Sequence, residues 1–425
     1  MTLSSGALRA DPGFRRYLAA RVITTAGTLV TAVVLPVLVY RLTWSAAWTA
    51  AVVVAEALPH LLLARVVARI AVRLKHGALL FAADLAGAAL LTSIPLAWWN
   101  GHMSAWHVLA VACAMQVVFL LLAAAHTSAL HALVGPELTT AGGSALRGAT
   151  GLVELMVPPL AGLAVAIVAP APLLVLDAVS FLVSALLVRG AIRGRPGAPA
   201  LPKPRQVRTG LRFLRGNRPS RTLVVAGTLH AAAGAAYLAM LLPWADRQLG
   251  VPPSGDARLA LLVSCWGLGV IVGRSAAPLL IRRIGPVRLA RRALVVALAG
   301  GLGVLVCTNW LLAALAGLLW GAAYIVAVRA TMDALGQPAR PVARLLWRSV
   351  GPVTGAALAG ALAVWSTPRA GLAAGVTLLA VATLTVRRTA VAVPPDSVPT
   401  QGARTRDCGP DCAGDCSGTQ HPSSP

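Results

Sequence analysis

The sequence has few charged residues for its length, and few of those are acidic. Only 12% of its 425 residues are charged, and 13 aspartates and glutamates stand against 37 lysines and arginines. A soluble protein of this size carries about twice that charged fraction, so the composition argues against a soluble fold. No G-x-x-x-x-G-K-[ST] sequence occurs, which argues against ATP hydrolysis through that loop.

Hydrophobic residues are what the chain has in excess. They make up 57% of it and gather in runs of about 20 residues, the length that crosses a bilayer as a helix. The net charge of +24 lies in short basic segments between these runs, so we expect an all-α membrane protein and no nucleic-acid partner. Twelve transmembrane spans are predicted, at about 17–40, 46–64, 78–98, 105–125, 148–168, 172–190, 222–244, 257–279, 289–308, 310–328, 346–366 and 370–386.

The basic residues also predict the orientation of these spans. An even number of spans places both termini on one side, and the side richer in lysine and arginine is cytoplasmic. Cytoplasmic termini put 33 of the 37 lysines and arginines on the inner side and 4 on the outer side. We therefore expect a multi-pass protein of the cell membrane with both termini in the cytoplasm.

The most basic segment lies in the middle of the chain, at residues 189–221. It carries nine arginines, one lysine and no acid, and each such charge costs about 2.5–3.5 kcal/mol at the bilayer centre. We interpret it as a cytoplasmic linker between two six-helix bundles, with an amphipathic surface helix at 206–214. The predicted domains are an N-terminal bundle at 1–190, the linker at 191–221, a C-terminal bundle at 222–388 and a disordered cytoplasmic tail at 389–425.

The two halves resemble each other at one loop. Residues 68–77 read ARIAVRLKHG and residues 277–286 read APLLIRRIGP, each a short basic turn after the second span of its half. Internal duplication of this kind is typical of secondary transporters, whose binding site lies near the bilayer midplane between the repeats.

Several short stretches add a more specific pattern, spread over about residues 14 to 390. They are FRR at 14–16, PVLVYRLT at 36–43, ADL at 83–85, Pro158 with LAG at 160–162, LDAVSF at 176–181, GLRFL at 210–214, and Gly267, Gly269 and Gly273.

Together these stretches resemble the major facilitator superfamily, in particular its branch of drug and siderophore exporters that includes the enterobactin exporter. The resemblance implies the major facilitator fold and export of a small amphipathic compound by alternating access, with protons moving in the opposite direction. It also implies a transporter rather than an enzyme, without a cofactor. We expect a monomer whose partners are the lipid bilayer, protons and a small-molecule substrate.

The cytoplasmic loops depart from the pattern of this family. The family normally places an aspartate before the basic residue of the loop between spans 2 and 3, where this chain has Val72, and Ile281 occupies the matching place in the second half. In the family that aspartate takes part in gating contacts, and its loss leaves open a transporter-like scaffold or sensor that moves no substrate. A membrane-embedded lipid enzyme is a weaker alternative, since it needs clustered acids or histidines at a membrane surface and the sequence shows no such cluster. The gate loop is assigned to the basic residues that remain, namely Arg73, Lys75, Arg282 and Arg283.

Four acids fall within the predicted spans, namely Glu56, Asp84, Glu154 and Asp177. An ionisable residue inside the membrane is a functional candidate by default, because its burial is costly. A carboxyl group that titrates near neutral pH loads a proton on one side and releases it on the other, as proton antiport requires. Asp84 and Asp177 also fit a structural role near helix ends, so both interpretations stand for them.

The other two acids have alternatives as well. Glu56 either lines the cavity or bonds carbonyls that a kink at Pro59 frees. Glu154 lies two turns after Arg147, too far for a direct pair, so each is expected to find a partner on another helix. Arg21 in the first span either meets one of the acids or extends to the inner surface, and we favour the latter.

The remaining candidates are weaker. Three cysteines in the tail at a four-residue period suggest a metal site, although their spacing does not match common zinc motifs and a disordered tail is the favoured interpretation. Glycines in spans 8 and 11 have spacings that favour close helix packing. The cysteines are Cys408, Cys412 and Cys416, and the glycines are Gly267, Gly269, Gly273, Gly351, Gly355 and Gly360.

Overall fold

The structure is a computed structural model that describes residues 11–192, 205–253 and 256–389. Within these ranges the regular elements are all helices, which confirms the predicted all-α class. The three tail cysteines and residues 193–204 of the basic linker lie outside the described residues.

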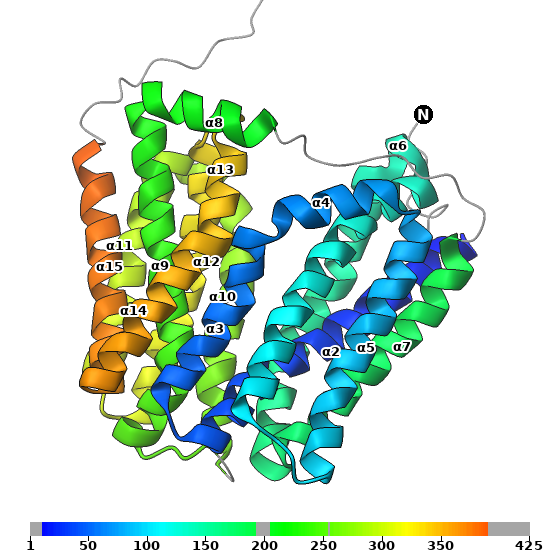
Figure 1. Ribbon diagram of the computed structural model, residues 1–425. Helices are drawn as coiled ribbons and strands as arrows, with labels where there is room; N and C mark the ends of the chain where they lie inside the picture. Colours follow the sequence, from blue (N-terminus) through cyan, green and yellow to red (C-terminus); the bar gives the residue numbers. More distant parts are fainter. Residues whose placement is uncertain (1–10, 193–204, 254–255, 390–425) are drawn as a thin grey trace, which may run out of the picture. The chain divides into compact units, whose positions relative to one another are not determined.

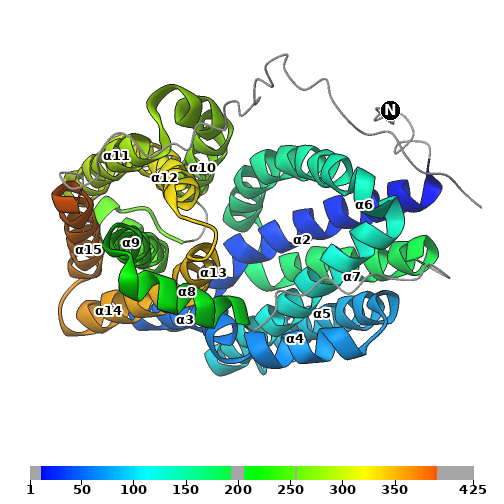
Figure 2. The same cartoon turned by 90° about the horizontal axis from the view of Figure 1, so that it is seen from above.

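The first bundle is formed by the helices that precede the linker. Helix α2 packs against α7 and α6, and α5 packs against the same two helices, while α3 lies between them and the second half of the chain (Figures 1 and 2). The bounds of these helices are α2 Pro12–Thr43, α3 Ala46–Leu62, α4 Ala64–Arg73, α5 His76–Trp99, α6 Ala105–Ile167 and α7 Pro170–Ile192.

The long helix α6 contains two spans joined end to end. Its 63 residues are broken at Gly135, whose φ of 74° is in the left-handed region that glycine adopts without a steric penalty. The two parts, Ala105–Gly135 and Glu137–Ile167, are each long and apolar enough to cross a membrane. The sequence predicted a loop between 125 and 148, whereas the chain stays helical on both sides of this break.

The second bundle follows the linker. Helix α9 contacts α15, α14 and α12, and α12 packs against both α10 and α11. The bounds are α8 Arg205–Gly216, α9 Arg218–Leu249, α10 Ala257–Ile284, α11 Pro286–Val306, α12 Trp310–Ala334, α13 Arg340–Leu345, the π-helical turn η1 Leu346–Val350, α14 Gly351–Trp365 and α15 Pro368–Thr389.

The described helices agree with the predicted number of spans. Ten are long and apolar enough to cross a membrane when the two parts of α6 are counted separately. The shorter apolar helix α3 and the continuous segment α13–η1–α14 bring the total to twelve. The exact domain limits stay predictions, and α9 already begins at Arg218, inside the predicted linker.

Two short helices lie across the end of the bundles that is predicted to be cytoplasmic (Figure 1). One is α4, and the other is α8, which confirms the helix expected near 206–214. Helix α8 packs against α13, where a Cβ on Gly210 would collide with Pro338 and Val342. The second half of the chain thus fixes the helix that ends the linker.

Most of the predicted packing glycines do lie at close helix contacts. A Cβ on Gly269 or Gly273 would collide with the backbone of α12, and one on Gly355 would collide with the backbone of α9. Gly360 comes close to Ala50 on α3 and so brings the two bundles together. Gly267 is different, because nothing lies within 4 Å of its Cβ position.

Candidate functional site

Two of the four intramembrane acids lie inside the first bundle and are hydrogen-bonded there. Asp84 on α5 is 1% exposed and accepts a hydrogen bond from Ser184 Oγ at 2.7 Å. Asp177 on α7 is 0% exposed and accepts hydrogen bonds from Thr31 Oγ1 at 2.5 Å and Ser180 Oγ at 2.9 Å. Because all these partners belong to the same bundle, the two aspartates hold α2, α5 and α7 together.

The position of Asp177 also depends on a glycine of α2. A Cβ on Gly27 would collide with the side chains of Asp177 and Ser180 and lie 2.9 Å from the Cα of Asp177. Only glycine therefore allows α2 to approach α7 this closely. The hydrogen bond from Thr31, one helical turn along α2, then fixes the contact.

The other two acids line cavities between the bundles. The larger cavity, about 560 Å³, is walled by α2, α6 and α7 of the first bundle and by α10 of the second. This volume is typical of pockets for small molecules, which span roughly 300–1,000 Å³. Its polar and charged lining residues are Arg21, Thr24, Thr25, Thr28, His126, Glu154 and Arg274.

An ion pair joins the two bundles at this cavity. Arg274 Nη1 on α10 donates to Glu154 Oε2 on α6. The side chains of Arg274 and Glu154 remain 43% and 28% exposed, so the pair borders open space rather than a sealed interface. The expectation that Glu154 finds its partner on another helix is confirmed, and Arg147 is exposed and is not that partner.

A second network lies in the first bundle beside the same cavity. Arg21 Nη1 lies 2.9 Å from His126 Nε2, and Tyr17 Oη lies 3.0 Å from His126 Nδ1. A guanidinium group only donates, so His126 Nε2 accepts and the ring proton sits on Nδ1, which donates to Tyr17. The hydroxyl of Tyr17 in turn donates to the backbone oxygen of His126 at 3.3 Å. Arg21 thus binds a neutral imidazole at the cavity wall. The favoured prediction, that Arg21 extends to the inner surface, was wrong.

The smaller cavity, about 310 Å³, contains Glu56. Its other polar lining side chains come from three further elements: Gln116 on α6, Tyr324 on α12 and Arg348 on the π-helical turn η1. Glu56 therefore faces the space between the bundles, which was one of its two expected environments. Single π-helical turns within α-helices occur frequently at functional sites.

An aromatic cluster of the second bundle separates the two cavities. The Trp266 ring lines both of them, and its centroid lies 4.6 Å from that of Tyr237, 5.5 Å from that of Trp320 and 5.6 Å from that of Tyr324. Tyr237 and Trp320 are almost completely buried, so they fix the Trp266 ring from behind. Trp266 thus forms an apolar border that the two cavities share.

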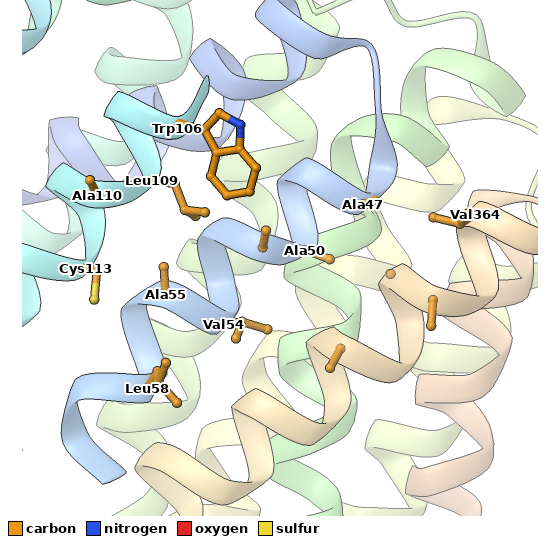
Figure 3. Close-up of a pocket in the computed structure, with 14 residues that line it drawn as sticks. Ala47, Ala50, Val54, Ala55, Leu58, Trp106, Leu109, Ala110, Cys113 and Val364 are labelled. Atoms are coloured by element: carbon orange, nitrogen blue, oxygen red, sulfur yellow. The ribbon is translucent and has the colours of Figure 1, made fainter. Parts of the chain in front are cut away.

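A third hollow, about 600 Å³, has a different character. It lies between α3, the first part of α6 and α14, and its side chains are almost all apolar (Figure 3). Trp106 lies at one end near Leu109, and Cys113 is the one lining side chain with an ionisable group. Without a charged group in its wall, this groove cannot orient a polar ligand, and we do not count it as part of the site.

The side predicted to be outer is held closed by hydrogen bonds between the bundles. Tyr40 Oη donates to Asp246 Oδ2 at 2.7 Å, and Arg41 Nε donates to the backbone oxygen of Pro253 at 2.8 Å. Arg247 Nη2 also donates to the oxygen of Trp44 at 3.2 Å. These contacts tie the end of α2 to the end of α9 and the loop that follows it.

The predicted gate residues lie at the opposite side. Lys75 precedes α5, and Arg282 and Arg283 end α10, all three exposed. The side chain of Arg73 lies outside the described residues, as does that of Val72. The gating role of these residues stays a prediction. Within the described ranges, no group of three or more His, Cys, Asp and Glu residues is placed to hold a metal ion.

Several residues of the site were not predicted, among them Gln116, His126, Trp266, Arg274, Tyr324 and Arg348. Arg274 and Arg348 fell within predicted spans but were counted only as inner positive charges. The rule that marks intramembrane acids as candidates applies equally to arginines and would have identified both. His126 was placed in a loop, and no local signal indicates that it faces Arg21.

Comparison with known proteins shows the fold. A bacterial homologue of the human lysosomal transporter Spinster, inward-facing and unoccupied, matches with a TM-score of 0.70 at 14% identity over 89% of this chain and 98% of that chain. The nucleoside transporter NupG matches with 0.70 at 11% identity over 88% and 98%. A bacterial homologue of the iron transporter ferroportin in its inward-facing state matches with 0.64 at 15% identity over 88% and 98%.

These three are membrane transporters of the major facilitator type. The described helices therefore have the predicted major facilitator fold, with twelve spans in two six-helix bundles. No protein-family model matches the sequence, and no curated protein matches it at a significant level.

Proposed function

We propose that the protein is a secondary active transporter that exports a small amphipathic compound by alternating access, coupled to protons moving inward. The observation that carries this proposal is the pair of cavities between the bundles, with Glu154 on one wall and Arg274 on the other. A site shared by two halves at the middle of the membrane is where transporters of repeated architecture bind their substrates. The direction of export and the exporter branch rest on the sequence resemblance.

Alternating access is supported by the contacts on the outer side. The hydrogen bonds of Tyr40 and Arg247 hold that side closed and must break for the cavity to open outward. Three or four hydrogen bonds at about 0.5–1.5 kcal/mol each are weak enough to be exchanged for contacts on the opposite side. The predicted gate at Arg282 and Arg283 belongs to that opposite side.

Proton coupling is assigned to Glu154 and Glu56. An ionised Glu154 attracts Arg274 across the cavity, and a proton on Glu154 removes that attraction. In the outward-open state Glu154 takes up a proton from outside, and after the bundles rock it releases the proton inside and pairs with Arg274 again. Glu56 faces the neighbouring cavity and is the second candidate. Asp84, Asp177, Arg21 and Arg147 are left with supporting roles.

The test is transport in vesicles with an imposed pH gradient. Purified protein in liposomes is screened for movement of amphipathic compounds, and E154Q and E56Q are compared with E137Q. Glu137 lies on the same helix as Glu154 but is exposed and outside both cavities, which makes it a matched control. We expect at least a tenfold loss of gradient-driven transport in E154Q and none in E137Q. Transport that ignores the gradient in the wild type, and survives both cavity substitutions, would refute proton antiport. A wild type that moves no compound would favour the scaffold alternative.

The cell-membrane location, the cytoplasmic termini and the monomeric state belong to the same proposal. The cytoplasmic placement of the termini is supported by the excess of lysine and arginine on one side of the predicted spans. Labelling of single cysteines near either end of the chain in intact and opened cells tests the placement of the termini. A label that reaches either end in intact cells would contradict it.

A further inference from the structure

The smaller cavity is surrounded by polar groups that the protein itself does not pair. Glu56, Gln116, Tyr324 and Arg348 all line it. In the part of the chain that the structure describes, these four side chains form no hydrogen bond or ion pair with the rest of the protein. Arg348 is exposed, and Glu56, Gln116 and Tyr324 are partly exposed, so these polar side chains are accessible to a ligand. Four unpaired groups around one space of about 310 Å³ indicate a place for a polar ligand.

The backbone around Arg348 is built to present this residue. The π-helical turn Leu346–Val350 interrupts the regular helix between α13 and α14 and carries Arg348 at its centre. Its neighbour Trp347 is anchored on α9, where its Nε1 donates to the oxygen of Val224 at 3.0 Å and its ring fills the space above Gly227. The turn is therefore fixed from behind while Arg348 faces the cavity.

The charges of the two cavities decide the sign of the ligand. Three arginines line them, Arg21, Arg274 and Arg348, against two acids, Glu56 and Glu154. Arginine stays charged at any accessible pH, whereas a carboxylate can be neutralised by one proton. Glu154 is already committed to Arg274, and Arg21 binds a neutral imidazole. Summed over the two cavities, the arginines outnumber the carboxylates by one, and this excess positive charge is permanent. In the smaller cavity Arg348 faces Glu56, so the charge of Arg348 is unbalanced when Glu56 carries a proton.

We propose that the smaller cavity binds the anionic group of the substrate, an oxyanion such as a carboxylate or sulfonate, with Arg348 as its charge partner. Gln116 and Tyr324 donate hydrogen bonds to the same group. The apolar body of the substrate lies against the Trp266 ring, which borders both cavities. The substrate class is therefore an amphipathic organic anion. This inference rests on the proposed function, since it names what that site carries.

The experiment measures binding without transport. The full chain is placed in phosphatidylcholine nanodiscs, and equilibrium dialysis measures the binding of 2-naphthoate, neutral 2-naphthamide and cationic 2-naphthylmethylammonium against empty nanodiscs. We expect naphthoate to bind at least tenfold more tightly than the cation. R348Q should weaken naphthoate about ten- to hundredfold, the effect of losing a hydrogen bond to a charged group, and R348K should retain part of the affinity.

Two variants separate this effect from general damage. R212Q removes an exposed arginine of α8 that lines neither cavity and should leave binding unchanged. E56Q removes the one acid of the smaller cavity, and we expect naphthoate binding to stay equal or become tighter because a like charge is gone. Loss of binding in E56Q equal to that in R348Q would instead indicate a distorted site and overturn the assignment.

The remaining outcomes are also decisive. Equal or tighter binding of the cation, an unaffected R348Q, or no binding of 2-naphthoate to the wild type would each refute an anion site at Arg348. A protein that binds naphthoate but transports nothing would refute the proposed transport and leave the anion site standing. Proton-driven transport by the wild type, together with unchanged naphthoate binding by R348Q, would support the proposed transport and refute the anion site.

Discussion

The interior of the first bundle and its wall toward the second bundle both contain carboxyl groups, and they use them differently. Asp84 and Asp177 are almost completely buried and accept hydrogen bonds from hydroxyl groups of their own bundle. Glu154 is partly exposed, and its partner Arg274 belongs to the other bundle, while Glu56 faces a cavity. An acid inside a membrane protein is costly in either place, but only the second pair can respond when the bundles move.

The difference lies in what must change for the proton to leave. A carboxyl group held by Thr31 and Ser180 within one rigid bundle keeps its environment in every state of a rocking cycle. The environment of Glu154 changes as soon as Arg274 moves away with α10. Coupling therefore requires partners that move relative to each other, and this criterion separates the four acids better than burial does.

The largest effect is expected where the interior contact is most crowded. In G27A the added methyl group would overlap Asp177 and Ser180, so α2 must move away from α7. We expect a loss of about 1–3 kcal/mol of folding stability from such overpacking. Thermal unfolding of the purified protein, followed by size-exclusion chromatography, measures it.

The matched substitution is G267A on the cavity wall. Nothing lies within 4 Å of the added methyl group, so its stability should stay within about 0.5 kcal/mol of the wild type while transport slows. Equal loss of stability in the two variants would show that the interior and the wall are not as different as described.

The number of spans and the surface helix could be predicted from sequence, but the side of each span that faces the cavity could not. The number of spans depends on the local hydropathy of each run, and the α8 helix on a local amphipathic pattern, so both were predicted. Which side of a span faces the cavity depends instead on how the helix is rotated among its neighbours. The sequence therefore could not separate Glu154 from Asp177, nor place His126 beside Arg21.

An effect of the same size at most is expected from the hydrogen bonds of the interior aspartate. D177A removes the acceptor of Thr31 and Ser180, and we expect it to lower stability by about 1–3 kcal/mol at most, as for buried groups left unpaired. E154A removes a partly exposed ion pair, and such pairs contribute about 0–1 kcal/mol. Chemical unfolding monitored by tryptophan fluorescence compares the two.

The same two variants should rank in the opposite order for gradient-driven transport. Residual folded D177A should keep its response to the pH gradient, and E154A should lose it. A D177A protein that folds well but no longer responds to the gradient would place Asp177 in the coupling machinery and abolish the distinction between interior and wall.

The smallest change concerns the balance between states rather than the fold. Tyr40 and Asp246 belong to different bundles, and Y40F removes only the hydroxyl that joins them at 2.7 Å. A hydrogen bond to a charged group contributes about 1.5–3 kcal/mol, so the fraction of molecules open to the outer side should rise about tenfold or more. Accessibility of a cysteine at Thr28, in the larger cavity, to a membrane-impermeant thiol reagent added from outside measures this fraction. The unfolding temperature should fall only slightly, because neither bundle loses an internal contact. A large fall in the unfolding temperature without greater accessibility would mean that the contact stabilises the fold and does not close the outer side.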